Sequence, residues 1–308
     1  MGAGMTAVLS IVRKPLDGFA VLVMLVLCMC FGLQQVAVVV AAPSIHPVMQ
    51  MALRCGFAAL LVSVLMWWRG GSFSVRDGTL WPGLAAGVLF AVEFFCVSTG
   101  LIYTTASHMV VFLYTAPIFT VLGLHYCVAA ERLGRVQWLG VLLAFGGIAY
   151  AFSDSLGQSA ASTGDMLLGD LLAVLGGLSW AATTIVVRTT TLSEAAPTRT
   201  LLYQLVVAAV LLLGVAGALQ EFSIVAISDI AWASLLFQSV IVAFACFLAW
   251  FWLLRRYLAS RISAFSFLTP LFGVAFGILL LDDPISPRFA IGAMLVLAGI
   301  VMVNLRRT

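Results

Sequence analysis

The chain has 308 residues, of which 63% are hydrophobic and only 9% are charged. Soluble domains carry about 25% charged residues, so this chain has too few charges to cover a surface exposed to water. The mean hydropathy of +1.17 and the long uncharged runs indicate lipid as the main solvent. The composition therefore excludes a soluble enzyme, a nucleic-acid-binding protein and a disordered chain.

Apolar stretches of roughly 20 residues, enough to cross a hydrocarbon core of about 30 Å, alternate with short segments rich in charge, Pro, Gly and Ser. They predict an all-α polytopic membrane protein with ten transmembrane helices. In chain order the predicted spans are 18–41, 47–68, 80–101, 105–127, 136–152, 166–187, 200–220, 230–253, 261–281 and 288–305. The first span could also be a signal peptide, because Arg13 and Lys14 precede it, but a later span matches it.

The basic residues predict the orientation of the chain. With the N-terminus in the cytoplasm, Arg288 lies outside, Arg54 lies within a span, and the other 13 of the 15 Lys and Arg residues lie inside. Such a bias is typical of the cytoplasmic side of membrane proteins. We therefore expect both termini to be cytoplasmic.

A pattern in the first half of the chain recurs 152 or 153 residues later. It consists of Tyr114-Thr-Ala-Pro117, Glu131, Gly140 and Gly147-Ile148, and its echo consists of Thr269-Pro270, Asp282-Asp283-Pro284, Gly292 and Gly299-Ile300. The recurrence predicts two homologous five-helix halves, residues 1–153 and 164–308. Because five is an odd number, the second half enters the membrane from the opposite face, which makes an inverted repeat typical of secondary transporters.

These motifs resemble the drug/metabolite transporter superfamily, in particular its EamA-type ten-helix members. The family's usual Trp-Gly in the first span appears here as Phe31-Gly32, the second half keeps Trp180-Ala181, and the second acidic turn carries Asp282-Asp283 in place of Glu. The resemblance implies a secondary-active exporter of small metabolites, such as amino acids or related amphipathic compounds, across a bacterial inner membrane. It further implies alternating access, and fifth and tenth helices that support the bundle or join a weak homodimer of a protein that is otherwise a monomer.

Two charged residues lie deep within predicted spans, where charge is costly and by default functional. At 1.5 Å per residue, Arg54 lies about 10 Å and Glu93 about 12 Å below the outer interface. Gln34 and Gln35 of the first span reach the same layer. We expect Arg54 and Glu93 to pair until a zwitterionic substrate gives its carboxylate to Arg54 and its ammonium to Glu93. Glu93 could also carry a coupling proton, and the alternative is a contact that only fastens two helices together.

Other polar or aromatic side chains within spans are weaker candidates for the substrate cavity. Trp180, near mid-span, either walls the cavity or serves packing. His108 lies one turn inside the outer interface, where it either titrates or is a hydrogen-bonded interfacial residue. The remaining candidates are Tyr114, Tyr203, Gln204, Gln238 and Ser266.

Pro117 and Pro270 fall at matching positions of the fourth and ninth spans, where proline kinks a helix. Their repetition favours a shared gating bend, with static curvature as the alternative.

Other classes of membrane protein fit the sequence less well. An intramembrane enzyme needs a nucleophile and base, paired acids or a metal cluster, and the scattered histidines and single deep carboxylate form none. A channel relies on rings of polar groups in an oligomer, and ATP-driven transport needs a phosphate-binding loop that is missing. We expect a carrier that uses no cofactor or metal and contacts its small-molecule substrate and the lipid bilayer. Import or exchange of another metabolite is the alternative function.

Overall fold

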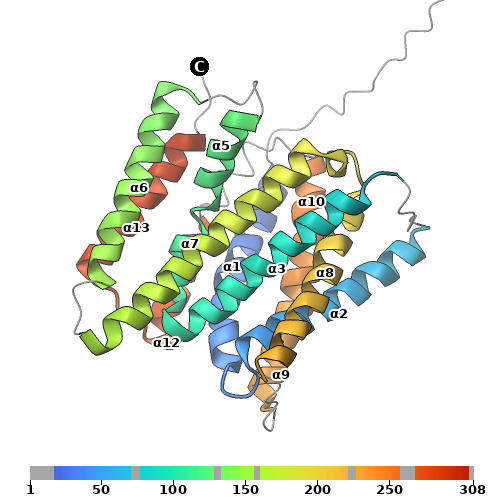
Figure 1. Cartoon of the computed structure of the whole chain (residues 1–308), viewed down its shortest axis with the longest axis horizontal. Coiled ribbons are helices and arrows are strands. Elements are labelled where there is room, and N and C mark those ends of the chain that lie inside the picture. The colour runs from blue at the N-terminus through green and yellow to red at the C-terminus, as the bar shows by residue number, and fades with distance from the viewer. Residues whose placement is uncertain are drawn as a thin grey trace, which may run out of the picture.

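The computed structural model describes residues 17–70, 77–127, 133–155, 160–220, 227–256 and 268–304, and every regular element in these ranges is a helix. Figure 1 shows the helices packed into one bundle. In chain order they are α1 (Gly18–Ala41), α2 (Pro47–Trp68), α3 (Leu80–Tyr103), α4 (Ala106–Leu113), α5 (Ala116–Cys127), α6 (Arg135–Ser155), α7 (Ala160–Thr189), the 3₁₀ turn η2 (Thr191–Ser193), α8 (Pro197–Ala218), α9 (Asp229–Leu236), the π-helix η3 (Phe237–Cys246), α10 (Phe247–Arg256), α12 (Leu268–Leu281) and α13 (Pro287–Asn304).

Seven stretches of the described residues are long and apolar enough to cross a membrane. They are Gly18–Ala41, Pro47–Trp68, Leu80–Tyr103, Ala106–Cys127, Asp165–Thr189, Pro197–Ala218 and Asp229–Trp250. Three further apolar helices, Arg135–Ala151, Leu268–Leu281 and Pro287–Val303, are shorter. The predicted all-α polytopic class is confirmed. Ten crossings and two inverted halves stay predictions, since three of the ten predicted spans coincide with the short helices.

The ends of the helices follow from capping residues in the sequence. The Asp17 carboxylate accepts a hydrogen bond from the Ala20 amide at 2.8 Å at the start of α1. Thr105 caps α4 in the same way, and Ser228 caps α9. Proline stands at the start of α2 and of α8, where its missing N–H costs nothing.

Helices from the two predicted halves pack along one another. The most extensive contacts join α6 to α13, α3 to α7, α2 to α8 and α1 to α12, and Figure 1 shows α6 and α13 side by side at one edge of the bundle. The repeated glycines explain the α6–α13 contact. A Cβ atom added to Gly140 would lie 2.8 Å from the Gly299 carbonyl oxygen, and one added to Gly147 would lie 2.8 Å from that of Gly292. Glycine thus lets the two backbones touch.

The fourth predicted span is interrupted. Helix α4 ends at Leu113 and α5 begins at Ala116, so Tyr114 and Thr115 lie between two helices. The Thr115 hydroxyl donates to the Phe112 carbonyl oxygen at 2.6 Å, which satisfies an acceptor at the end of α4. Pro117, the second residue of α5, has no N–H to continue the hydrogen-bond ladder. The predicted bend is therefore a break, whereas residues before 268, which would reveal a bend at Pro270, lie outside the described ranges.

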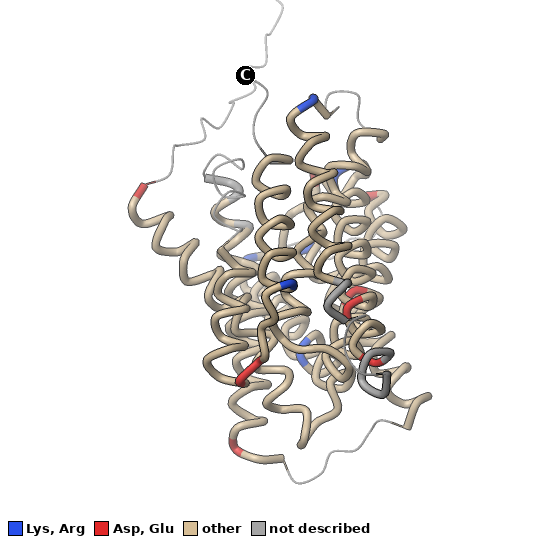
Figure 2. Tube along the Cα trace, turned by 90° about the vertical axis from the view of Figure 1, so that its left-hand side faces the viewer, with Lys and Arg blue, Asp and Glu red and all other residues tan. Residues whose placement is uncertain are grey.

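Few charged residues interrupt the bundle, as Figure 2 shows. Arg54 and Glu93 are buried, as the sequence predicts, with 0% and 6% of their surfaces exposed. Asp170, four residues after the start of the predicted span 166–187, is also 0% exposed. It lies on α7, nearly three turns from the start of the helix, where the Thr104 and His108 side chains contact it.

Candidate functional site

Arg54 is positioned by α2, whose neighbouring residues are apolar and leave its guanidinium in the interior of the bundle. The guanidinium carbon lies 4.2 Å from the centre of the Phe94 ring on α3, a cation–π contact. The neighbouring Cys55 thiol interacts with the Arg54 side chain, but among the described residues none of the three guanidinium nitrogens has a partner at hydrogen-bond geometry. A buried cation with all its donors unused is costly, and an anion that accepted those hydrogen bonds would remove the cost.

Glu93 lies next to Phe94 on α3 and presents the opposite charge. Its Oε2 atom is buried and has no hydrogen-bond partner among the described residues. Arg54 and Glu93 are close enough to interact electrostatically. The Phe94 ring lies over the face of the guanidinium, and none of its nitrogens is hydrogen-bonded to the described Glu93 side chain, so a direct pairing of the two charges stays a prediction. Both charges thus have unused hydrogen-bonding capacity.

Two aromatic candidates contact each other, and one of them interacts with Glu93. Tyr114, at the break between α4 and α5, meets Trp180 of α7 edge-to-face, with ring centroids 5.2 Å apart and an interplanar angle of 83°. Tyr114 also interacts with the Thr269 side chain of α12 and, electrostatically, with Glu93. The candidate site therefore combines Arg54, Glu93, Tyr114 and Trp180, which the sequence predicted separately, and it draws on both halves of the chain.

The predicted glutamines divide into two groups. Gln34 and Gln35 of α1 are buried, and Gln35 Oε1 has no partner in the described structure. Gln238, on the π-helix η3, donates through Nε2 to Gln50 Oε1 and to the Ser234 hydroxyl, both at 3.0 Å. Gln238 thus joins α2 to the second half of the chain. Gln50, which the sequence reading missed, also donates to backbone carbonyls at Val38 and Ile45.

Two more candidates lie on α8, and one lies outside the described residues. Tyr203 of α8 contacts the Thr79 hydroxyl at 3.3 Å, at the start of α3. Gln204, its neighbour, is half-buried. Ser266 is outside the described ranges.

The segment before α3 forms an ionic contact with the second half of the chain. Asp77 forms an ion pair with Arg199 of α8 and accepts a hydrogen bond from the Thr79 hydroxyl at 2.6 Å. The Thr191 hydroxyl donates to the Gly78 carbonyl oxygen at 3.1 Å. The hydrogen bond from Thr79, together with Arg199, lowers the pKa of Asp77 from 3.8 to about 2. This carboxylate is therefore charged at every physiological pH.

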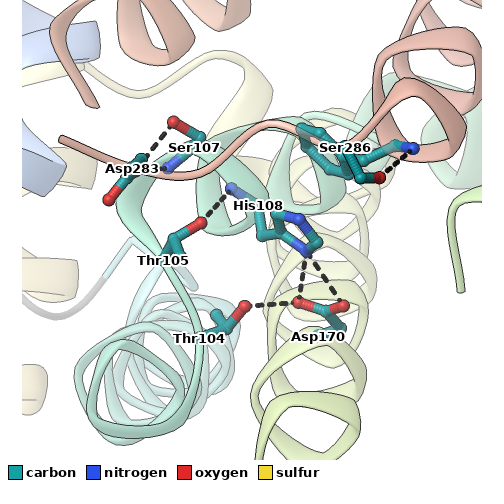
Figure 3. A network of polar contacts seen from close by, with 8 residues as sticks. Thr104, Thr105, Ser107, His108, Asp170, Asp283 and Ser286 are labelled. Carbon is teal, nitrogen blue, oxygen red and sulfur yellow. Dashed lines mark hydrogen bonds and ion pairs between the residues drawn. The ribbon is translucent and has the colours of Figure 1, made fainter. Parts of the chain in front are cut away.

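His108 belongs to a separate buried network. Its Nδ1 atom lies 3.1 Å from both carboxylate oxygens of Asp170, and the Thr104 hydroxyl donates to the same carboxylate at 2.5 Å. Figure 3 shows Thr104 and His108 directed at Asp170 from one side of it. His108 is only 1% exposed and is hydrogen-bonded, while its depth in the membrane and its role stay predictions. An acid within the predicted span 166–187 was the signal that could have revealed Asp170.

Two cavities of about 290 and 340 Å³ lie between helices. The first is lined by residues of α2, α3 and α8, including Arg199 and Tyr203, and the second by residues of α1, α2 and α3, including His46. Neither is lined by Arg54 or Glu93.

The long apolar helices and the buried charges between them define the class: the protein is a polytopic α-helical membrane protein. The sequence profile of the EamA-like transporter family matches residues 18–153 and again residues 167–305, and the chain belongs to this family. The family resemblance noted in the sequence is thereby confirmed. Membership of this family identifies the chain as a membrane transporter.

Similar proteins are known from several bacteria. The chain is 24% identical over 281 residues to the uncharacterized transporter YoaV of Bacillus subtilis (strain 168), covering 88% of this chain and 92% of the relative. It is 29% identical to the uncharacterized protein PA1977 of Pseudomonas aeruginosa, covering 82% of each chain. A solved crystal structure, described only as that of a protein, matches with a TM-score of 0.64 at 18% identity, over 92% of this chain and 95% of that one. That match shows the fold alone.

Proposed function

We propose that the protein is a secondary-active transporter that exports small zwitterionic metabolites, such as amino acids, across the bacterial inner membrane by alternating access. The observation that carries the proposal is the fully buried Arg54 guanidinium with three unused nitrogens, near a buried Glu93 carboxylate with an unused oxygen. An amino acid matches this arrangement, because its carboxylate accepts from Arg54 bidentately and its ammonium donates to Glu93. Tyr114 and Trp180 supply an aromatic wall for an apolar side chain.

The packing of the helices supports alternating access between two inverted halves. Each contact between predicted spans should recur when the first five spans are exchanged with the last five. The contact of α3 with α7 then corresponds to the contact of α1 with α9 and η3. The contact of α1 with α12 corresponds to the contact of α7 with α4 and α5. Such paired contacts are expected when two homologous halves are related by a pseudo-two-fold axis. The same family profile also matches each half separately. Two halves of this kind can rock about a central site.

The break at Tyr114 and Thr115 supports a hinge in this movement. Discontinuous helices are a recurring feature of transporter binding sites, and here the break places Tyr114 beside Glu93. Substitution Pro117→Ala restores a backbone donor near the break and should slow transport severalfold. The matched control, Pro197→Ala at the start of α8, should leave the rate unchanged, and an equal rate in both variants would remove the hinge from the proposal.

The proposed function is tested by counterflow in proteoliposomes. Purified protein is reconstituted into vesicles that hold an excess of one unlabelled amino acid, and uptake of the same tritiated amino acid is followed across a panel of amino acids. Saturable counterflow is expected for at least one member of the panel, with a loss of about tenfold or more in Arg54→Gln and Glu93→Gln. Asp229→Asn, at the exposed start of α9, is the control. Linear flux without saturation would indicate a channel, and normal counterflow in both variants would contradict the site.

A further inference from the structure

The cavity of about 290 Å³ is a groove along one face of α8. On α8 it is lined by residues that recur at the three- and four-residue spacing of a single helix face, namely Arg199, Leu202, Tyr203, Val206 and Val207. From the first to the last of these residues the helix rises about 12 Å. Met66 of α2 and Leu84 of α3 line the other sides, and Figure 1 shows both helices close to α8. The groove is therefore elongated, and its two polar residues lie towards the end where α8 begins.

Arg199 has hydrogen-bonding capacity left over at this polar end. Its Nη1 atom forms the ion pair with Asp77, whereas its Nη2 atom is buried and has no hydrogen-bond partner among the described residues. The Thr79 hydroxyl gives its only hydrogen to Asp77, so the Tyr203 hydroxyl is the donor in its own contact with Thr79. Arg199 Nη2 is thus the unused donor of the groove, and a ligand that fits it must supply an acceptor.

The polar end lies at the level expected for lipid headgroups. A Cβ atom added to Gly83 would meet the Tyr203 ring, and one added to Gly87 would meet the Val207 side chain. Helices α3 and α8 therefore begin at the same end of the bundle. Trp81, in the first turn of α3, is exposed there. Exposed tryptophan at the end of an apolar helix is typical of the membrane interface.

The rest of the groove suits a hydrocarbon chain. Beyond Arg199 and Tyr203 every residue that lines it is apolar. Val206, which lies two turns into the groove, is 44% exposed, so the groove opens on the outside of the bundle. A ligand that enters from that side meets a cation at headgroup level and an apolar path beyond it.

We propose that this groove binds an anionic phospholipid, whose phosphate accepts a hydrogen bond from Arg199 Nη2 and whose acyl chain lies along α8. Hydrogen bonds between guanidinium and phosphate are strong because both groups are charged, and basic pockets between membrane helices recognise anionic headgroups. Asp77 occupies only the Nη1 side of the guanidinium and holds it in place. With the predicted orientation, the start of α8 is cytoplasmic, so the lipid belongs to the inner leaflet. The site is independent of Arg54 and Glu93 and of any transported substrate.

The headgroup contact is tested by native mass spectrometry of the purified protein in detergent. Phosphatidylglycerol or phosphatidylcholine with the same acyl chains is added, and the dissociation constant of the first bound lipid is measured. The wild type should prefer phosphatidylglycerol by about fivefold or more, and Arg199→Gln should lose that preference. Arg135→Gln, at the exposed start of α6, should keep it. Equal affinity for the two lipids in the wild type, or an unchanged preference in Arg199→Gln, would overturn the proposal.

The path of the acyl chain has a matched pair of variants on α8. Val206→Trp places a large side chain in the groove and should weaken binding of phosphatidylglycerol by about fivefold or more. Val210, one turn further along, is 64% exposed and does not line the groove. Val210→Trp should therefore bind the lipid within about twofold of the wild type. An equal effect of the two substitutions would contradict the proposed path. This pair leaves Arg199 and Asp77 intact, so it decides the matter if Arg199→Gln does not yield monodisperse protein.

A free anion is distinguished from a lipid by thermal unfolding in detergent. A ligand that binds only the folded protein raises its Tm, so phosphatidylglycerol should raise the Tm of the wild type more than that of Val206→Trp. Glycerol 3-phosphate, which carries the phosphate without acyl chains, should leave the Tm of the wild type unchanged. An increase with glycerol 3-phosphate equal to that with the lipid would show that the groove recognises phosphate alone, and would overturn the assignment of a lipid.

Discussion

At the scale of single residues, the sequence identified the two buried charges but not their partners. A hydropathy profile places Arg54 and Glu93 inside the membrane, because both stand in long apolar runs. Whether the guanidinium faces a carboxylate or an aromatic ring depends on side-chain rotamers, and the ring of Phe94 takes that place here. The sequence did not predict that Asp170 is buried, because this residue lies near the end of its predicted span. Its burial depends on contacts with Thr104 and with His108 of α4.

A prediction at this scale concerns Asp77. Its pKa is lowered from 3.8 to about 2 by the Thr79 hydroxyl and by Arg199. A lowered pKa stabilises the fold at pH values above the ordinary pKa, and the contribution is lost as the pH falls through the lowered value. Asp77→Asn should therefore lower the Tm of the purified protein by an amount that is constant between about pH 5 and pH 8. A difference in Tm that changes across this range would show that another group titrates within the contact.

At the scale of elements, length and hydropathy were enough to find a helix at each predicted span, but not to describe its interior. Pro117 indicated an irregularity between α4 and α5, because proline has no N–H with which to continue a helical hydrogen-bond ladder. The π-helix from Phe237 to Cys246 has no comparable signal. Its ten residues are ordinary helix formers, and π-helical turns depend on how the segment packs. It carries Gln238 into contact with Gln50 of α2.

The contact of α6 with α13 provides a prediction with a control at the adjacent residue. Gly147→Leu places a side chain where its Cβ would lie 2.8 Å from the Gly292 carbonyl oxygen, and should lower the free energy of unfolding by about 1–3 kcal/mol. At Gly146 a Cβ atom meets nothing within 4 Å, so Gly146→Leu should leave stability unchanged or raise it slightly. Thermal unfolding in detergent measures both. Equal losses in the two variants would show that close packing is not what requires glycine at position 147.

At the scale of the whole molecule, the sequence predicted the family, which the profile match confirms, and proposed a symmetry that the structure does not prove. Contacts join the two halves at opposite ends of the helices. Ser44 and Ser228 share a hydrogen bond of 3.2 Å between the segments that follow α1 and precede α9. Asp77 and Arg199 join the segment before α3 to α8. The first contact is neutral and the second ionic, a difference that depends on individual side chains rather than on the repeat.

Inverted topology predicts that the turns after α1 and after α7 lie on opposite sides of the membrane. Ser44 belongs to the first turn and Ser193 to the second. In intact cells, and in a Cys127→Ser background because Cys127 is exposed, a membrane-impermeant maleimide should label Ser44→Cys and not Ser193→Cys. Both should be labelled in inverted vesicles or after permeabilisation. Labelling of both sites in intact cells would contradict the inverted arrangement and the cytoplasmic placement of the termini.

The central claim, that Arg54 holds a substrate carboxylate, is tested most directly by the ability of the carrier to distinguish an amino acid from its amide. Competition with counterflow of a tritiated amino acid is measured for the unlabelled amino acid and for the corresponding amino acid amide, which keeps the ammonium and lacks the carboxylate. The wild type should prefer the amino acid by about tenfold or more, as expected for a charged hydrogen bond. In Arg54→Gln that preference should fall to about twofold or less. If Arg54→Gln distinguishes the two compounds as well as the wild type does, the carboxylate binds elsewhere and the proposed site is wrong.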